Sequence, residues 1–195
     1  MTFPIRQATL EDQVRIRKLY SRVAQESGGL ARTPEEVTDS FVSSLIRNCT
    51  RNGLILLVED PRSLEILGLI HAASGELSVL RHVLGELTLL IHPRLQGRGY
   101  GKSLFVEFLK RVCSELPRVL RVELRARASN LAALGLYESV GFVREGLFRD
   151  RIQTRSGALE DGIPMVWFNP DWESRSNGCP SQIPLGLNEG ESALQ

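Results

Sequence analysis

The stretch of residues 86–112 constrains the fold of this chain more than any other. It begins with an apolar run rich in β-forming residues, breaks at Pro93, passes through three glycines and continues with apolar residues at helical spacing. This order predicts a strand, a glycine loop and a helix. Such a loop leaves the first amides of the helix unpaired, where the helix dipole adds positive potential, so it suits a phosphate or pyrophosphate.

The composition of the loop supports binding of an anion. Gly97, Gly99 and Gly101 remove side chains that would hold an anion away from the amides, and Arg98 and Lys102 add positive charge. A glycine trio can also serve only to make a tight connection, and the loop alone does not decide between these interpretations.

Spacing tests which phosphate ligand the loop would bind. A Walker A loop requires a glycine where Gln96 stands, and the dinucleotide fingerprint requires one where Lys102 stands. Both patterns therefore fail by a single residue, which disfavours a nucleotide phosphate-binding protein.

The segment Gln96-Gly97-Arg98-Gly99-Tyr100-Gly101 resembles the pyrophosphate loop, Gln/Arg-x-x-Gly-x-Gly/Ala, of the GNAT superfamily of acyl-CoA-dependent N-acetyltransferases. A second motif follows downstream, where a strand is succeeded by a helix that resembles the second half of the GNAT core. Its matching positions are Asn130, Ala133, Tyr137, Glu138, Gly141 and Phe142. The resemblance covers roughly residues 3–168 and rests on two motifs in the order and at the separation usual for the family.

The periodicity of the whole chain predicts elements in the order of that fold. We expect strands at 3–8, 54–59, 64–72, from Glu86 to the glycine loop, 119–126, 147–154 and 159–168. We expect helices from Thr9 to about residue 25, from a Thr33 cap through 52, after the glycine loop, and at 130–140. The expected fold class is α/β, a GNAT (acyl-CoA N-acyltransferase) fold with a mixed central sheet of about seven strands and helices on both faces.

Length and composition suit one domain, 1–168, followed by a disordered tail, 169–195, that is rich in Pro, Ser, Gly, Asn and Glu. No apolar run approaches membrane-spanning length and no signal-peptide pattern is present, so we expect a cytoplasmic protein that does not bind membranes. The net charge of +1 is too small for nucleic-acid binding. Three cysteines and three scattered histidines show no metal-ligand spacing, so we expect no metal.

The resemblance implies that the pantetheine arm of acetyl-CoA pairs with backbone at the end of the central strand, at Leu90 and Ile91, where an amide would polarise the thioester carbonyl. It implies that Gln96 to Lys102 hold the pyrophosphate and that Asn130 and Tyr137 face the arm from the downstream helix. Tyr137 would protonate the departing CoA sulfur. We expect Glu86 to be the general base, with Glu123 as the alternative, although both carboxylates can equally be solvated surface groups.

We therefore expect an N-acetyltransferase that moves an acetyl group from acetyl-CoA to a primary amine, by direct attack in a ternary complex. The alternative is a non-catalytic acyl-CoA-binding sensor module of the same fold. The acceptor is left open between a small molecule and a protein amine, and the oligomeric state is also open, a homodimer included.

Overall fold

The computed structural model describes residues 3–26 and 30–172. Its strands are β1 (Ile5–Gln7), β2 (Gly53–Glu59), β3 (Ile66–Ala73), β4 (Val83–Ile91), β5 (Arg121–Arg127), β6 (Val143–Arg144), β7 (Phe148–Gln153) and β8 (Leu159–Phe168). Its α-helices are α1 (Gln13–Gln25), α2 (Asp39–Asn52), α3 (Tyr100–Glu115) and α4 (Leu131–Ser139), and four short 3₁₀ turns lie between these elements. None of the described helices is long and apolar enough to cross a membrane.

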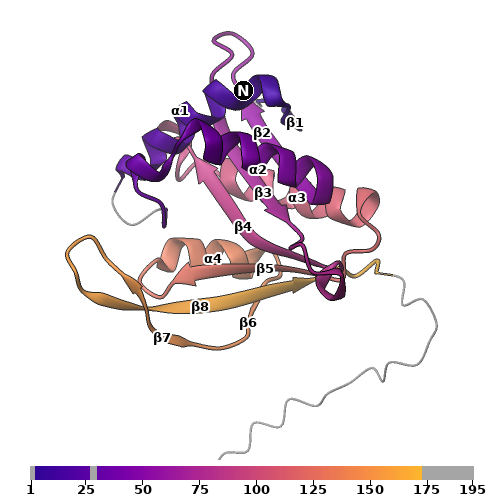
Figure 1. Cartoon of the computed structure of the whole chain (residues 1–195), viewed down its shortest axis with the longest axis vertical. Helices are drawn as coiled ribbons and strands as arrows, with labels where there is room; N and C mark the ends of the chain where they lie inside the picture. Colours follow the sequence, from indigo (N-terminus) through magenta and orange to yellow (C-terminus); the bar gives the residue numbers. More distant parts are fainter. Residues whose placement is uncertain (1–2, 27–29, 173–195) are drawn as a thin grey trace, which may run out of the picture.

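The strands form one mixed sheet in the order β1-β2-β3-β4-β5-β8-β6, with β7 also paired to β8 (Figure 1). β1 to β4 are mutually antiparallel, β4 and β5 are parallel, and β5 pairs antiparallel with β8. The predicted GNAT-type α/β architecture is confirmed, with eight strands where about seven were expected. The additional strand is β6, which has only two residues and is too short to leave a periodic pattern in the sequence.

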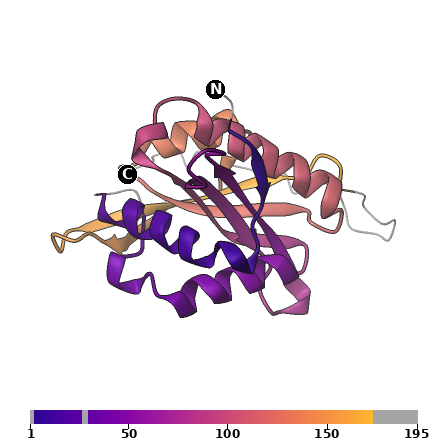
Figure 2. The same cartoon turned by 90° about the horizontal axis from the view of Figure 1, so that it is seen from above.

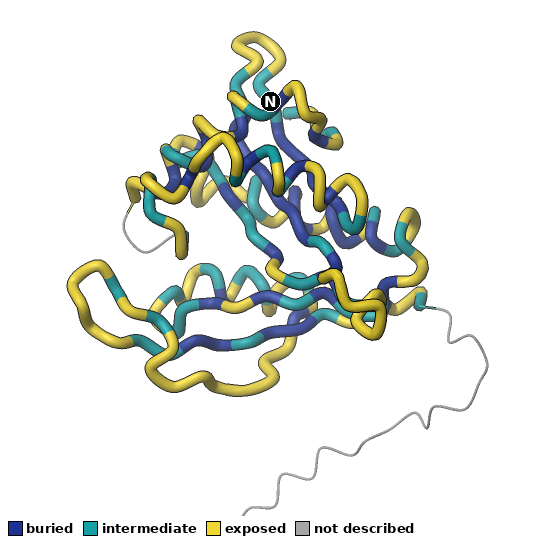
Figure 3. Tube along the Cα trace, viewed as in Figure 1, coloured by how far each residue is buried: buried dark blue, intermediate teal, exposed yellow. Residues whose placement is uncertain are grey.

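Helices cover both faces of the sheet (Figure 2). α1 and α2 pack on one face through a core that includes Ile16, Ile46 and Leu69, whereas α3 and α4 pack on the other through a core that includes Phe105 and Leu134. Buried residues concentrate along β2 and β3, which lie between these layers (Figure 3). Continuous apolar sequence in these two strands follows from coverage on both faces.

The second helix begins later than its sequence signals predicted. Thr33, Pro34 and Glu36 do form a capping box, but it caps a separate 3₁₀ turn, Pro34–Glu36. α2 starts at Asp39, after Thr38, whose hydroxyl accepts a hydrogen bond from the amide of Phe41 at 3.1 Å. Two successive threonine caps occur in this sequence, and the predicted helix start at the earlier one is wrong.

β4 begins at Val83, so the predicted start of this strand at Glu86 was wrong by three residues. The pairing with β3 shifts register between His71 and Ala73, and Glu86 has a φ of 53°. A bulge therefore interrupts the alternation of the strand, which is why a simple period-two pattern located the wrong start.

The folded chain continues past Phe168. The side chain of Asn169 is buried and donates to the carbonyl of Val119 at 2.9 Å, so the boundary drawn before residue 169 falls too early. The remainder of the predicted tail, 173–195, lies outside the described residues.

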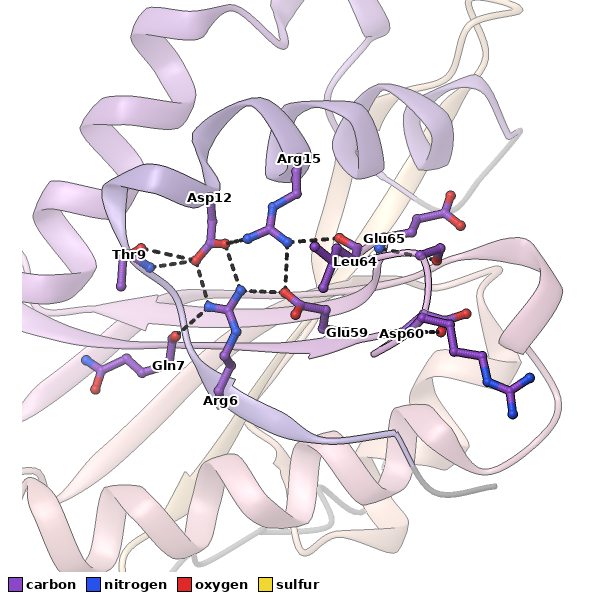
Figure 4. A network of polar contacts seen from close by, with 11 residues as sticks. Arg6, Gln7, Thr9, Asp12, Arg15, Glu59, Asp60, Leu64 and Glu65 are labelled. Carbon is purple, nitrogen blue, oxygen red and sulfur yellow. Dashed lines mark hydrogen bonds and ion pairs between the residues drawn. The ribbon is translucent and has the colours of Figure 1, made fainter.

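A buried carboxylate anchors the first strand and helix to the sheet (Figure 4). Asp12 is 1% exposed and accepts two hydrogen bonds from Arg6 at 2.8 Å, one from the Thr9 amide at 2.9 Å and another from Arg15. Both arginines also reach Glu59 at the end of β2. Burial opposes ionisation of Asp12, but the hydrogen bonds and positive charges outweigh it and lower its pKa to about 2.

Asp12→Asn should lower the free energy of unfolding by roughly 2–4 kcal/mol, because it leaves two arginines beside a neutral group in a largely buried network. The matched control is Asp39→Asn, which removes the exposed ion pair with Arg17 and should cost about 0–1 kcal/mol. Urea unfolding of both variants checks this.

The native pKa of Asp12 lies below its ordinary value, so its contribution is fully present above about pH 4 and is lost as the pH falls toward 2. The difference in stability between wild type and Asp12→Asn should shrink over this window. Equal costs for the two variants at neutral pH would contradict the anchoring role.

Candidate active site

β4 and β5 are joined at only one end. Their parallel ladder consists of the pairs Val83↔Arg121 and Leu84↔Val122, after which the bulge at Glu86 turns β4 away (Figure 1). The remainder of β4 pairs with β3 alone. One backbone edge in the middle of the sheet is therefore left without a neighbouring strand.

The antiparallel pairing of β4 with β3 determines which backbone groups of β4 face the open edge. The His92 amide donates to the Leu67 carbonyl at 2.8 Å, and backbone groups alternate in direction along a strand. Leu90 accordingly faces β3, where it pairs with Leu69, while the amides and carbonyls of Leu89 and Ile91 point to the open edge. The Ile91 carbonyl accepts a hydrogen bond from the Gln96 side chain at 3.1 Å.

The glycine loop follows directly from this edge. Gly97 and Gly99 have φ values of 70° and 81°, in the left-handed region that favours glycine. Within the described chain, the amides of Gly97, Gly99, Gly101 and Lys102 have no hydrogen-bond acceptor. These donors surround the first turn of α3, an arrangement that can bind a phosphate or pyrophosphate.

Tyr137 lies on α4 with its ring packed against Phe105 and Phe142, at centroid distances of 5.7 and 6.2 Å. Burial raises the pKa of its hydroxyl, so the group stays protonated at neutral pH. No group among the described residues hydrogen-bonds this hydroxyl, and the residue lines a cavity. A fixed, protonated and unpaired hydroxyl can act as a proton donor.

The two candidate bases differ in their position relative to that cavity. Glu86 lines it, with a side chain that is 85% exposed and paired with Arg125 at 3.1 Å. Its positive φ is a local strain of the kind that clusters at functional sites. Glu123 pairs instead with Arg121 at 2.7 Å and lines only an adjoining depression, to which Glu86 also contributes.

The cavity has a volume of about 460 Å³ and lies where β4 and β5 have separated. Its walls come from β4, β5, α4, β7 and the connection between α1 and α2. Its floor includes Tyr20 and His71, whose side chains are joined by a hydrogen bond of 2.5 Å. Burial lowers the pKa of His71 to about 4, so this imidazole is neutral at pH 7.

Most of the predicted residues occupy two adjoining places, whereas Leu90 turns its backbone groups toward β3 and away from the open edge. Gln96 to Lys102 form the loop, with Arg98 and Lys102 exposed and Tyr100 packed against Phe3, while Glu86, Asn130 and Tyr137 line the cavity. Asn130 also caps α4, because its side-chain oxygen accepts from the Ala133 amide at 3.1 Å.

Other residues of the site escaped the sequence analysis. Leu89 was missed because the bulge obscures which backbone groups face the edge. Tyr20, His71 and Arg151 come from segments distant in the sequence and carry no local motif. No group of three or more His, Cys, Asp or Glu side chains suited to a metal occurs in the described part of the chain.

A strand edge left open beside an amide-rich glycine loop, with a tyrosine facing the adjoining cavity, is the arrangement of an acyl-CoA-dependent transferase fold. The model of the acetyltransferase (GNAT) family matches residues 17–142, well over half of the sequence. The chain belongs to this family.

Two curated proteins show partial sequence similarity. The [ribosomal protein bS18]-alanine N-acetyltransferase of Salmonella typhimurium is 36% identical over 92 residues, which cover 46% of this chain and 60% of that protein. The N-alpha-acetyltransferase RimI of Mycobacterium tuberculosis is 45% identical over 71 residues, which cover 36% of this chain and 41% of that protein. The match spans less than two thirds of either relative.

Among solved structures, a phosphinothricin acetyltransferase from Sinorhizobium meliloti in complex with acetyl-CoA has a TM-score of 0.75. It is 20% identical, and the match covers 90% of this chain and all of that one. This similarity establishes a shared fold.

Proposed function

We propose that the protein transfers an acetyl group from acetyl-CoA to a primary amine. The observation that carries the proposal is the open edge of β4, where the Leu89 and Ile91 amides lie between the glycine loop and the cavity of Tyr137. An acyl-CoA thioester lying along this edge would have its pyrophosphate at the loop and its acetyl group at the cavity. The family and the named activities of the relatives support the same reaction.

The chain's own residues supply each part of a direct transfer. The amine attacks the thioester carbon, and a backbone amide at the end of β4 stabilises the oxyanion that forms. Collapse of this intermediate breaks the carbon–sulfur bond, and Tyr137 gives its proton to the leaving thiolate. Glu86, directly or through water, removes the proton that the attacking amine must lose.

The relatives' names favour an N-terminal protein amine as acceptor, and a small amine is the other candidate. The tip of the last hairpin lies close to α1, where Arg155 donates to the Ala24 carbonyl at 2.5 Å. This contact ties α1, which supplies Tyr20 to the cavity lining, to the hairpin that supplies Arg151 and Ile152. It favours an acceptor that enters with a narrow end, such as a chain terminus, over one that lies across the site. A cytoplasmic location fits acetyl-CoA and such acceptors.

Tyr137→Phe should lower kcat about 100-fold with little change in the KM for acetyl-CoA, because it removes the proton donor and keeps the packed ring. Thiol release from acetyl-CoA with a panel of amines and peptides measures this. Ser139→Ala is the control, since its hydroxyl bonds only the Leu136 carbonyl of the same helix. Tight acetyl-CoA binding without turnover, unaffected by either variant, would point to a sensor module instead.

Glu86→Gln should slow the reaction near pH 7 and recover toward the wild-type rate as the pH rises toward the pKa of the acceptor amine. At high pH the amine loses its proton to solvent, and the base is no longer needed. The measurement is the pH profile of kcat/KM for both proteins. A rate deficit that stays constant across pH would assign Glu86 a structural role.

A further inference from the structure

The charge of the cavity is strongly one-sided. Its lining includes four arginines, Arg32, Arg125, Arg127 and Arg151, against a single carboxylate, Glu86. The side chains of His71 and Tyr20 at the base of the cavity do not offset this positive charge. Burial lowers the pKa of His71 to about 4, so it is neutral at pH 7, and burial raises the pKa of Tyr20, which keeps it protonated. An ordinary cationic amine would meet net repulsion here.

Two of the four arginines are neutralised within the protein. Arg125 pairs with Glu86 at 3.1 Å, and Arg127 pairs with Glu160 at 3.3 Å. Their charges therefore serve to position carboxylates and strands. They leave no free cation for a ligand.

The other two arginines, Arg32 and Arg151, have no carboxylate partner among the described residues. Arg32 lies over the ring of Phe41, with its guanidinium carbon 3.9 Å from the centroid, and its charge reaches Tyr20 and His71 on the floor. Arg151 comes from β7, where its stem packs against Gly162 of β8. Stacking on an aromatic ring restrains the guanidinium plane of Arg32 and leaves its N–H groups available.

A planar guanidinium fork is suited to a carboxylate or phosphate, to which it can donate two parallel hydrogen bonds. Glu86 pairs with Arg125 through Oε1 alone, so its Oε2, which has no partner among the described residues, can accept from the positive end of an acceptor. The lining therefore complements a molecule with an amine at one end and an anion a few bonds away.

We propose that the acceptor is a primary amine that carries a nearby carboxylate, which Arg32 and Arg151 bind within the cavity. The inference rests on the proposed acetyl transfer and specifies its substrate. The same chemistry is present in a free acidic amino acid and in a peptide whose residues next to the N-terminus are acidic. A polyamine has the opposite charge and should be a poor acceptor.

The test compares acceptor pairs that differ only in charge. L-Glutamate is assayed against L-glutamine, and a peptide with Asp as its second residue against the same peptide with Asn. Wild-type enzyme should favour the acidic member of at least one pair by about tenfold or more in kcat/KM, as expected for a charge-assisted hydrogen bond. Preference in the first pair identifies a small-molecule acceptor, and preference in the second a peptide.

The double variant Arg32→Gln/Arg151→Gln should bring that ratio close to one and leave the Kd for acetyl-CoA unchanged. Arg118→Gln is the matched control, because it removes one positive charge from an exposed site outside the cavity and should keep the wild-type ratio. Both arginines of the double variant are also exposed, and a thermal melt checks that it is folded.

A wild-type ratio near one, a preference for neutral or cationic acceptors, or a ratio unchanged in the double variant would overturn the assignment. A loss of acetyl-CoA affinity in the double variant, with the ratio of acidic to neutral acceptors unchanged, would also overturn the assignment, because it would place the two arginines at the acetyl-CoA site. None of these outcomes would argue against acetyl transfer itself. Failure of that activity would appear instead as no turnover with any acceptor and no effect of Tyr137→Phe.

Discussion

The hydrogen bonding between β4 and β5 stops after two residue pairs, and the rest of the site depends on that interruption. A sheet that continued to pair would satisfy the Leu89 and Ile91 backbone groups with a neighbouring strand and would fill the space now occupied by the cavity. The bulge at Glu86 turns β4 away, and helices pack on both faces of the sheet. The unpaired edge is stable only where water or a ligand can satisfy it.

The proposed donor and acceptor sites follow from the same separation of β4 and β5. Beyond the carboxyl end of β4, the glycine loop presents amides that have no acceptor in the described chain. Closer to the bulge, the space between the strands is lined by Tyr137, Glu86 and the arginines. One departure from regular pairing thus brings amides suited to an anion, the proposed oxyanion donor and the proposed acceptor pocket next to β4.

The sequence predicted the elements whose signals are local. The glycine loop, the helix after it and the helix expected at 130–140 are encoded by neighbouring residues, and the structure has them close to where they were expected. The α2 start and the β4 start were misplaced, because a second threonine cap and a bulge override simple periodicity. Arg151 had no signal, since its significance lies in which distant segments share a cavity and in its lack of a carboxylate partner among the described residues.

The central claim is that the open edge of β4 and the glycine loop bind acetyl-CoA through backbone amides. Amide-resolved NMR titration with acetyl-CoA tests it most directly. The amides of Leu89, Ile91 and the loop from Gly97 to Lys102 should shift strongly, while those of β2, enclosed between its neighbours, should not. Shifts confined to the outer face of α1, with β4 and the loop unaffected, would contradict the account.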